Sequence, residues 1–223
     1  MSFPVKPSIK ISEETLLKFV GNPSIVSLPT NISDEFLIKF SNLHTIALTD
    51  HHTITEKGLK NLLNLSSLNL RNYNSISAEA ITLHTGLETL RCNGNMTDSV
   101  LLGLTGLTAL SLWDSQIKGH GLRFLTNLTS LNLEGNLNLA HHHITHLTNL
   151  KRLLFGYNDN ITATLLKLPK LEVLDLKYTT GVVDNDLPDL PKLTRLRGYY
   201  QNITNRAAAA LEARGVTLQW LRD

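Results

Sequence analysis

The chain has 223 residues, a formal net charge of +2 and a single cysteine, Cys92. The near-balanced charge gives no whole-molecule attraction to nucleic acid or to an anionic membrane, and one cysteine excludes an intramolecular disulfide, which favours a reducing, cytoplasmic compartment. No apolar run approaches the roughly 18 residues of a membrane span, and the N-terminus lacks the apolar centre of a secretory signal, so no membrane association is expected.

Residues 1–22 are predicted to form an N-terminal cap around a short helix over Ser12–Val20. Ser12 can cap the first turn, and Glu13 and Glu14 suit the positive N-terminal end of a helix. An amphipathic helix in this place would cover the open end of a stacked core.

Residues 23–203 are predicted to be a series of repeats of 20–22 residues. In each unit apolar residues stand at the first, fourth and sixth places and often an asparagine at the ninth, as in Leu128–Asn136. The units begin at Pro23, Leu43, Leu65, Leu87, Leu107, Leu128, Leu150, Leu171, Leu193 and, less clearly, Gly215. A fixed period in this range is the signature of a solenoid.

Each unit is predicted to begin with a strand that buries one face. Ile46 and Leu48 point inward and alternate with Thr45 and Ala47, and neighbouring units then pair as parallel strands. The equivalent inward pairs are Val26/Leu28, Leu68/Leu70, Leu90/Cys92, Leu110/Leu112, Leu131/Leu133, Leu153/Phe155 and Leu174/Leu176. Cys92 stands where other units have leucine or phenylalanine, so it is expected to be a small buried hydrophobe and not a nucleophile.

The ninth place marks the turn out of the strand, where backbone groups lose their partners. A buried carboxamide can satisfy both a donor and an acceptor there, so these asparagines are expected to be structural. They are Asn31, Asn95, Asn136 and Asn158.

The second half of each unit is predicted to cross back as a short helix or helical turn, as in 54–62, 96–102 and 117–125. Residues 204–223 are predicted to form a C-terminal cap. Its alanine-rich helix runs from Thr204 to Arg214, ends at Gly215 and is followed by an edge strand.

The units of the form Leu-x-x-Leu-x-Leu-x-x-Asn resemble the leucine-rich repeat family and cover roughly residues 23–220. The phrases at 125–131 and 54–59 look most like bacterial members, including effectors of bacteria that interact with host cells. The resemblance implies a right-handed α/β solenoid, with a parallel sheet on its concave face and short helices on its convex face. It also implies that the chain binds a protein on its concave face. The likeness to bacterial members further implies a virulence effector that is translocated into a host cell. It implies no activity.

The third, fifth and seventh places are predicted to point outward on the concave face, with the eighth at the sheet edge. Arginines, a lysine and aromatic residues gather there, and these residue types are enriched at binding hot spots. The predicted partner-binding residues are Arg71, Arg91, Trp113, Arg152, Tyr157, Lys177, Tyr178, Arg195, Arg197, Tyr199 and Tyr200. An alternative left open is that some tyrosines at the eighth place only pack along the sheet edge.

The favoured partner is an acidic protein segment. The chain itself is expected to be monomeric. Arginine with aromatic residues also suits single-stranded nucleic acid. Four carboxylates predicted on the same face make that binding the weaker alternative, namely Asp50, Asp114, Glu134 and Asp175.

The histidines at His141–His143 and His146 raise the question of a metal site. His142 and His146 would align on a helix, but no cysteine or carboxylate lies within this segment to complete a site. No metal site and no cofactor are therefore expected. No nucleophile, phosphate-loop or paired-carboxylate motif occurs either, so the chain is predicted not to be an enzyme, with an unrecognised site as the remaining alternative.

Overall fold

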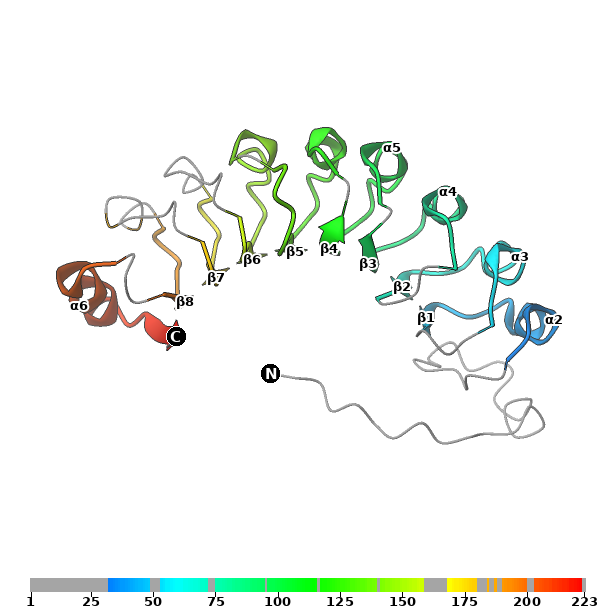
Figure 1. Cartoon of the computed structure of the whole chain (residues 1–223), viewed down its shortest axis with the longest axis horizontal. Helices are drawn as coiled ribbons and strands as arrows, with labels where there is room; N and C mark the ends of the chain where they lie inside the picture. Colours follow the sequence, from blue (N-terminus) through cyan, green and yellow to red (C-terminus); the bar gives the residue numbers. More distant parts are fainter. Residues whose placement is uncertain are drawn as a thin grey trace.

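The computed structural model describes residues 32–48, 53–71, 75–94, 96–115, 117–139, 141–158, 168–179, 184, 187, 190–199 and 203–221. These residues form an arc whose inner side is one sheet and whose outer side carries short helices (Figure 1). The predicted N-terminal cap and the strand of the first repeat, with Val26 and Leu28, lie outside the described residues.

The sheet of the described residues has nine strands, all parallel and paired in chain order. The register places equivalent positions side by side, as when Leu68 pairs with Leu90. The strands are β1 (Thr45–Ala47), β2 (Ser67–Asn69), β3 (Thr89–Gly94), β4 (Ala109–Ser115), β5 (Ser130–Asn132), β6 (Arg152–Leu154), β7 (Val173–Asp175), β8 (Arg195–Tyr199) and β9 (Thr217–Leu221). The predicted α/β solenoid with a parallel sheet on its concave side is confirmed.

The helices of the convex side are short because only about a dozen residues separate successive strands. They are α2 (Asp34–Leu37), η1 (Ile38–Phe40), α3 (Glu56–Leu59), α4 (Ala78–Ile81), α5 (Asp98–Leu101), η2 (His120–Phe124), η3 (His141–His143) and α6 (Asn205–Ala213). The η elements are 3-10 helices; η2 begins after Gly119, whose φ is 94°, and contains Gly121, and glycine disfavours a regular α-helix.

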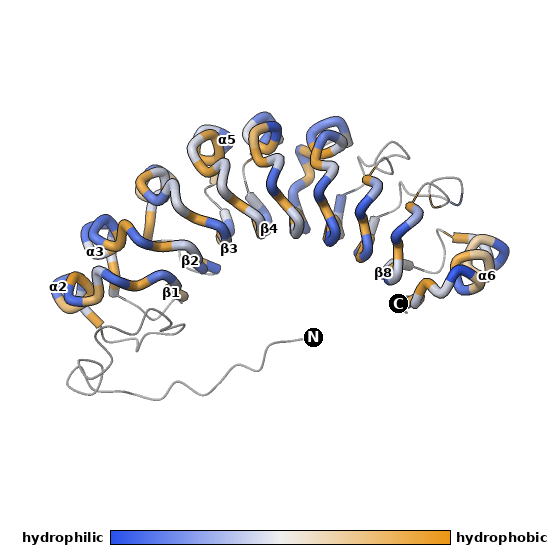
Figure 2. The backbone as a smooth tube through the Cα atoms, turned by 180° about the vertical axis from the view of Figure 1, so that it is seen from behind, coloured by the Kyte–Doolittle hydropathy of each residue, from blue (hydrophilic) through white to orange (hydrophobic). Residues whose placement is uncertain are grey.

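The core lies between the sheet and the helices and runs through the described repeats without a break. All seven inward pairs predicted among the described residues are buried, and Figure 2 shows apolar residues recurring at matching places in successive coils. Cys92 is 5% exposed, and burial raises the pKa of its thiol to about 12. The thiol therefore stays protonated at neutral pH, and the prediction of a small buried hydrophobe is confirmed.

Of the two ninth-place asparagines among the described residues, Asn136 has the full predicted structural role. The Oδ1 of Asn136 accepts hydrogen bonds from the N–H of Ser115 (2.9 Å) and its hydroxyl (2.5 Å). Its Nδ2 donates to the carbonyls of Leu112 (2.6 Å) and Leu133 (2.9 Å). At Asn158 the amide again donates to Leu133, at 3.1 Å, but the buried Oδ1 has no hydrogen-bond partner among the described residues. The other two lie outside the described residues, namely Asn31 and Asn95.

Carboxylates at the start of the convex helices bind the backbone of the next repeat. Asp34 accepts hydrogen bonds from the N–H (2.8 Å) and hydroxyl (2.5 Å) of Thr55. Asp98 accepts from the N–H groups of Lys118 and Gly121, each at 2.8 Å. These groups lie at the N-terminal end of the following helical turn, so each carboxylate caps the helical turn of the next repeat.

The predicted C-terminal helix is present as α6. The hydroxyl of Thr204 accepts a hydrogen bond from the N–H of Ala207 at 3.3 Å, and β9 follows and pairs with β8. The assignment of residues 204–223 as a cap stays a prediction. Within the described ranges, α6 and the other helices are all too short or too polar to cross a membrane.

Candidate protein-binding surface

Four predicted arginines are exposed, and the pleat of the strands explains the outward direction of three. Arg91 stands between two buried residues of β3, and Arg152 and Arg195 each precede a buried leucine of β6 and β8. Arg71 follows β2 and is exposed as well. None of the four forms an ion pair with another described residue.

Arg197 is placed on the same face but is already paired. Its Nη1 lies 3.2 Å from the Oδ2 of Asp175, which is only 7% exposed. The Oδ1 of Asp175 accepts from the backbone N–H of Lys177 at 3.1 Å. Asp175 is buried whereas Arg197 is partly exposed, so removing Arg197 would leave a buried carboxylate without its compensating charge. Arg197 therefore has a structural task in the fold, which its predicted role in binding did not include.

Lys177 lies over two stacked tyrosines. The ring centroids of Tyr157 and Tyr178 are 4.3 Å apart with an interplanar angle of 22°, and the two residues are 41% and 43% exposed. The ammonium nitrogen of Lys177 lies 5.7 Å from the first centroid and 5.0 Å from the second. This distance range gives a favourable cation–π interaction. The three side chains form one cluster that the sequence had placed only on a common surface.

The eighth place of the repeat has a left-handed backbone in five consecutive units. The φ values are 65° at Gly94, 49° at Asp114, 76° at Gly135, 62° at Tyr157 and 57° at Tyr178. Glycine adopts this conformation freely, whereas another residue loses about 1–2 kcal/mol. One stacked aromatic pair returns about 0.5–1.5 kcal/mol, which is less than the combined cost at two tyrosines.

Trp113 lies on the seventh place of its repeat and is 42% exposed. Its indole nitrogen is 3.5 Å from the position that a Cβ of Gly135 would occupy. Because Gly135 has no side chain, the indole lies over the eighth place of the next repeat.

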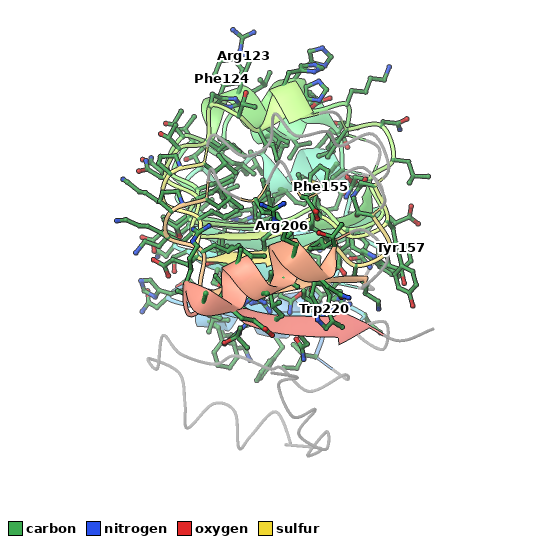
Figure 3. The ribbon with its side chains drawn as sticks, turned by 90° about the vertical axis from the view of Figure 1, so that its left-hand side faces the viewer. Arg123, Phe124, Phe155, Tyr157, Arg206 and Trp220 are labelled. Atoms are coloured by element: carbon green, nitrogen blue, oxygen red, sulfur yellow. The ribbon has the colours of Figure 1, made fainter. Side chains whose placement is uncertain are left out.

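Figure 3 places Tyr157 at the margin of the sheet toward which β9 points, well away from the buried Phe155. The tyrosines therefore lie at the C-terminal edge of the strands, next to the concave face. This position agrees with the alternative that the tyrosines pack along the sheet edge. More than a third of each tyrosine is nevertheless exposed.

Two predicted tyrosines are not described as side chains. The backbone of Tyr199 belongs to β8 and pairs with Leu221, and Tyr200 lies outside the described residues. Their part in binding stays a prediction.

The histidines interact with one another and with the backbone. The ring centroids of His142 and His143 are 3.9 Å apart, and those of His143 and His120 are 5.8 Å apart. His146 has its Nε2 3.3 Å from the carbonyl of Leu122 in the preceding repeat. The ranges given above contain no group of three or more histidine, cysteine or carboxylate side chains arranged to hold a metal ion.

Comparison with known proteins gives matches in structure and none in sequence. No family model matches the sequence, and no curated protein matches it significantly. An internalin (inlF) of Listeria monocytogenes superposes with a TM-score of 0.60 at 20% identity, covering 84% of this chain and 70% of that chain.

Two further solved structures have the same architecture. A chain of the yeast Rad7 and Elc1 complex superposes with a TM-score of 0.62 at 23% identity, covering 92% of this chain and 70% of that one. A leucine-rich repeat protein of Leptospira interrogans gives 0.54 at 19% identity, covering 87% and 64%. Together with the repeat and the nine-stranded parallel sheet of the described residues, these likenesses show that the chain has the leucine-rich repeat fold.

Proposed function

We propose that the chain is a non-catalytic protein-recognition module that binds a protein partner on its concave face. The observation that supports this most is the concentration of exposed arginine and aromatic side chains on one continuous sheet surface. Such side chains bury large areas on binding and retain polar groups for hydrogen bonds, which is why they dominate binding energies.

The charge of this surface favours an acidic partner. Five cationic side chains of the predicted set form no ion pair within the described ranges, namely Arg71, Arg91, Arg152, Lys177 and Arg195. Asp175 is neutralised by Arg197, so among the described residues the carboxylates predicted on this face that remain unneutralised are Asp114 and Glu134. The excess of unpaired cations steers an acidic partner to the face and raises its rate of association.

The place of action extends this proposal. A role inside a host cell, after delivery by a bacterium, is supported only by the repeat phrases of the sequence and by fold likeness to proteins of Listeria and Leptospira. A partner present in eukaryotic lysate and absent from bacterial lysate would support that role.

The test compares a triple variant of the concave face with a double variant of the convex face. Arg91→Ala/Arg152→Ala/Arg195→Ala removes exposed cations from the concave face, and Arg123→Ala/Phe124→Ala removes an exposed cation–π pair from the convex crest labelled in Figure 3. We expect a lysate protein captured by the wild type to be lost by the first variant and retained by the second.

Circular dichroism and the unfolding midpoint verify that both variants fold. Equal capture by all three proteins would contradict binding on the concave face. Capture of single-stranded nucleic acid, with an affinity that falls steeply with salt, would favour the nucleic-acid alternative.

A further inference from the structure

The C-terminal edge of the sheet carries a row of exposed aromatic side chains with one cation among them. We name this row the aromatic ledge and define it as Trp113, Tyr157, Lys177 and Tyr178. Trp113 belongs to the unit that begins at Leu107, and its indole lies over Gly135 of the next unit, which has no side chain at the eighth place. The two tyrosines come from the two units that follow, so the row spans four consecutive units of the solenoid.

The fold itself does not require tyrosine at these places. The eighth place needs a left-handed backbone, which glycine supplies without strain at Gly94 and Gly135. Tyr157 and Tyr178 accept the strain with rings that remain more than one third exposed, so burial in the core does not compensate for it. Backbone strain of this kind persists where the side chain serves a function.

The cation of the ledge is held in place without being neutralised. Lys177 lies over both tyrosine rings, and no carboxylate of the described residues is within ion-pairing distance of it. The nearest acidic position in sequence, Asp175, is bound to Arg197 and to the backbone N–H of Lys177. An ammonium group fixed by aromatic faces is a receptor for a carboxylate, because it has lost little of its charge.

The spacing of the rings fits an extended polypeptide. Parallel strands lie about 4.8 Å apart, so a ledge that spans four units from β4 to β7 is on the order of 14 Å long, the span of about four extended residues. The flat, exposed ring faces suit apolar side chains, and Lys177 suits an acidic side chain among them.

We propose that the aromatic ledge binds an extended acidic segment of a partner protein, with an aspartate or glutamate of that segment on Lys177. This inference rests on the proposed function and gives the partner its chemistry and the surface its anchor. It is distinct from the exposed arginines of the concave face, which act on the partner through long-range charge.

A displayed library of random twelve-residue peptides serves as the probe. The baits are the wild type, Tyr157→Gly/Tyr178→Gly, Lys177→Glu and Lys192→Glu. Glycine suits the left-handed backbone, so the tyrosine variant is expected to fold with an unfolding midpoint close to that of the wild type. Lys192 is an exposed residue in the turn before β8, and its substitution controls for the change in net charge.

We expect peptides enriched on the wild type and on Lys192→Glu to be rich in aspartate and glutamate and to be absent from selections on the other two baits. Synthetic peptides of this class should bind Lys177→Ala at least tenfold more weakly than the wild type, which corresponds to about 1.4 kcal/mol.

The remaining outcomes overturn the inference in different ways. Ledge-dependent peptides without an acidic excess would contradict the acidic partner, and tighter ledge-dependent binding of oligothymidylate would replace it with nucleic acid. A further selection uses Arg91→Ala/Arg152→Ala/Arg195→Ala as the bait. Peptides that are enriched equally on the wild type and the tyrosine variant but are lost from this bait would exclude the ledge while leaving the proposed function intact. No enrichment on the wild type would contradict the ledge as a binding site for an acidic segment, while the proposed function would still be decided by the capture of a lysate protein.

Discussion

His84 is a buried titratable residue in a place that leucine occupies elsewhere. It stands three residues before the first leucine of its repeat, where the neighbouring repeats have Leu62 and Leu104, and it is 1% exposed. Neither ring nitrogen makes a hydrogen bond of normal geometry with a described residue, and the backbone of Leu62 makes only a smaller contribution that opposes the effect of burial on the pKa of His84. Burial lowers the pKa of His84 below its ordinary value of 6.5, so the imidazole is neutral in the folded protein.

The stability of the protein is therefore expected to depend on this histidine in mild acid. Below pH 6.5 the unfolded chain binds a proton at His84 that the folded chain, with its lower pKa, does not yet bind. The free energy of unfolding thus falls as the pH decreases through 6.5 toward the pKa of the folded state. His84→Leu should remove this dependence and, because it also removes unsatisfied buried atoms, stabilise the fold by about 1–3 kcal/mol at neutral pH.

Urea unfolding at pH 7 and pH 5 measures the effect as a difference between the variant and the wild type. Carboxylates whose pKa is lowered, such as Glu56 and Asp184, lose stability in acid in both proteins and cancel in the difference. His44→Gln changes an exposed histidine and is the control. An equal loss of stability between pH 7 and pH 5 in His84→Leu and the wild type would exclude the proposed role of His84.

The elements of this fold are short and depend on bonds from neighbouring repeats. The convex helices α3, α4 and α5 have four residues each, far fewer than an isolated helix needs. Asparagine amides in the turns before the strands also donate to carbonyls of the preceding repeat, at distances of 3.0–3.2 Å. These bonds join Asn64 to Ser41, Asn127 to Thr105 and Asn149 to Thr126.

Asp98 is expected to stabilise the helical turn of the next repeat. Asp98→Ala removes both acceptors for the N–H groups of Lys118 and Gly121 and should lower the free energy of unfolding by about 1–2 kcal/mol. Asp98→Asn keeps one acceptor oxygen and should have an intermediate effect. Chemical denaturation measures both variants against Glu88→Ala, which changes an exposed carboxylate on the other side of the unit. If Asp98→Ala and Glu88→Ala cost the same, the bonds to the next repeat do not contribute to stability.

At the scale of the whole molecule, the solenoid has one continuous core but only neighbouring repeats in contact. Stability is then the sum of the units and their interfaces, and an inner unit has two interfaces where an end unit of the sheet has one. Leu131 in β5 is 0% exposed and packs between repeats, whereas Leu211 in α6 is 3% exposed in the last described unit.

The same substitution should therefore have different effects in the two places. Leu131→Ala is expected to cost about 2–5 kcal/mol and to reduce amide protection along the neighbouring strands. Leu211→Ala should cost less and reduce protection only near β9, because alanine also favours the helix α6. Denaturation with hydrogen exchange distinguishes the two variants. Uniform loss of protection in both would mean that the chain unfolds as a single unit and not repeat by repeat.

Most of the fold was predictable because each repeat contains the whole local pattern. The strand face, the buried place of Cys92 and the role of Asn136 each follow from the position within one unit, and the structure confirms all three. The binding surface was predictable only as a list of outward positions. The left-handed eighth place could have been found from Gly94 and Gly135, which stand in register with the tyrosines.

The sequence by itself determined the period, the solenoid and the face on which arginine and aromatic residues gather, because apolar spacing within a unit fixes which side chains are buried. Only the tertiary structure decided which of those residues act together. It pairs Arg197 with Asp175, stacks Tyr157 on Tyr178 and holds Lys177 over both. Apart from the contact between the adjacent residues Lys177 and Tyr178, these contacts join residues about 20 positions apart, and their geometry depends on strand register and backbone handedness, which no single repeat specifies.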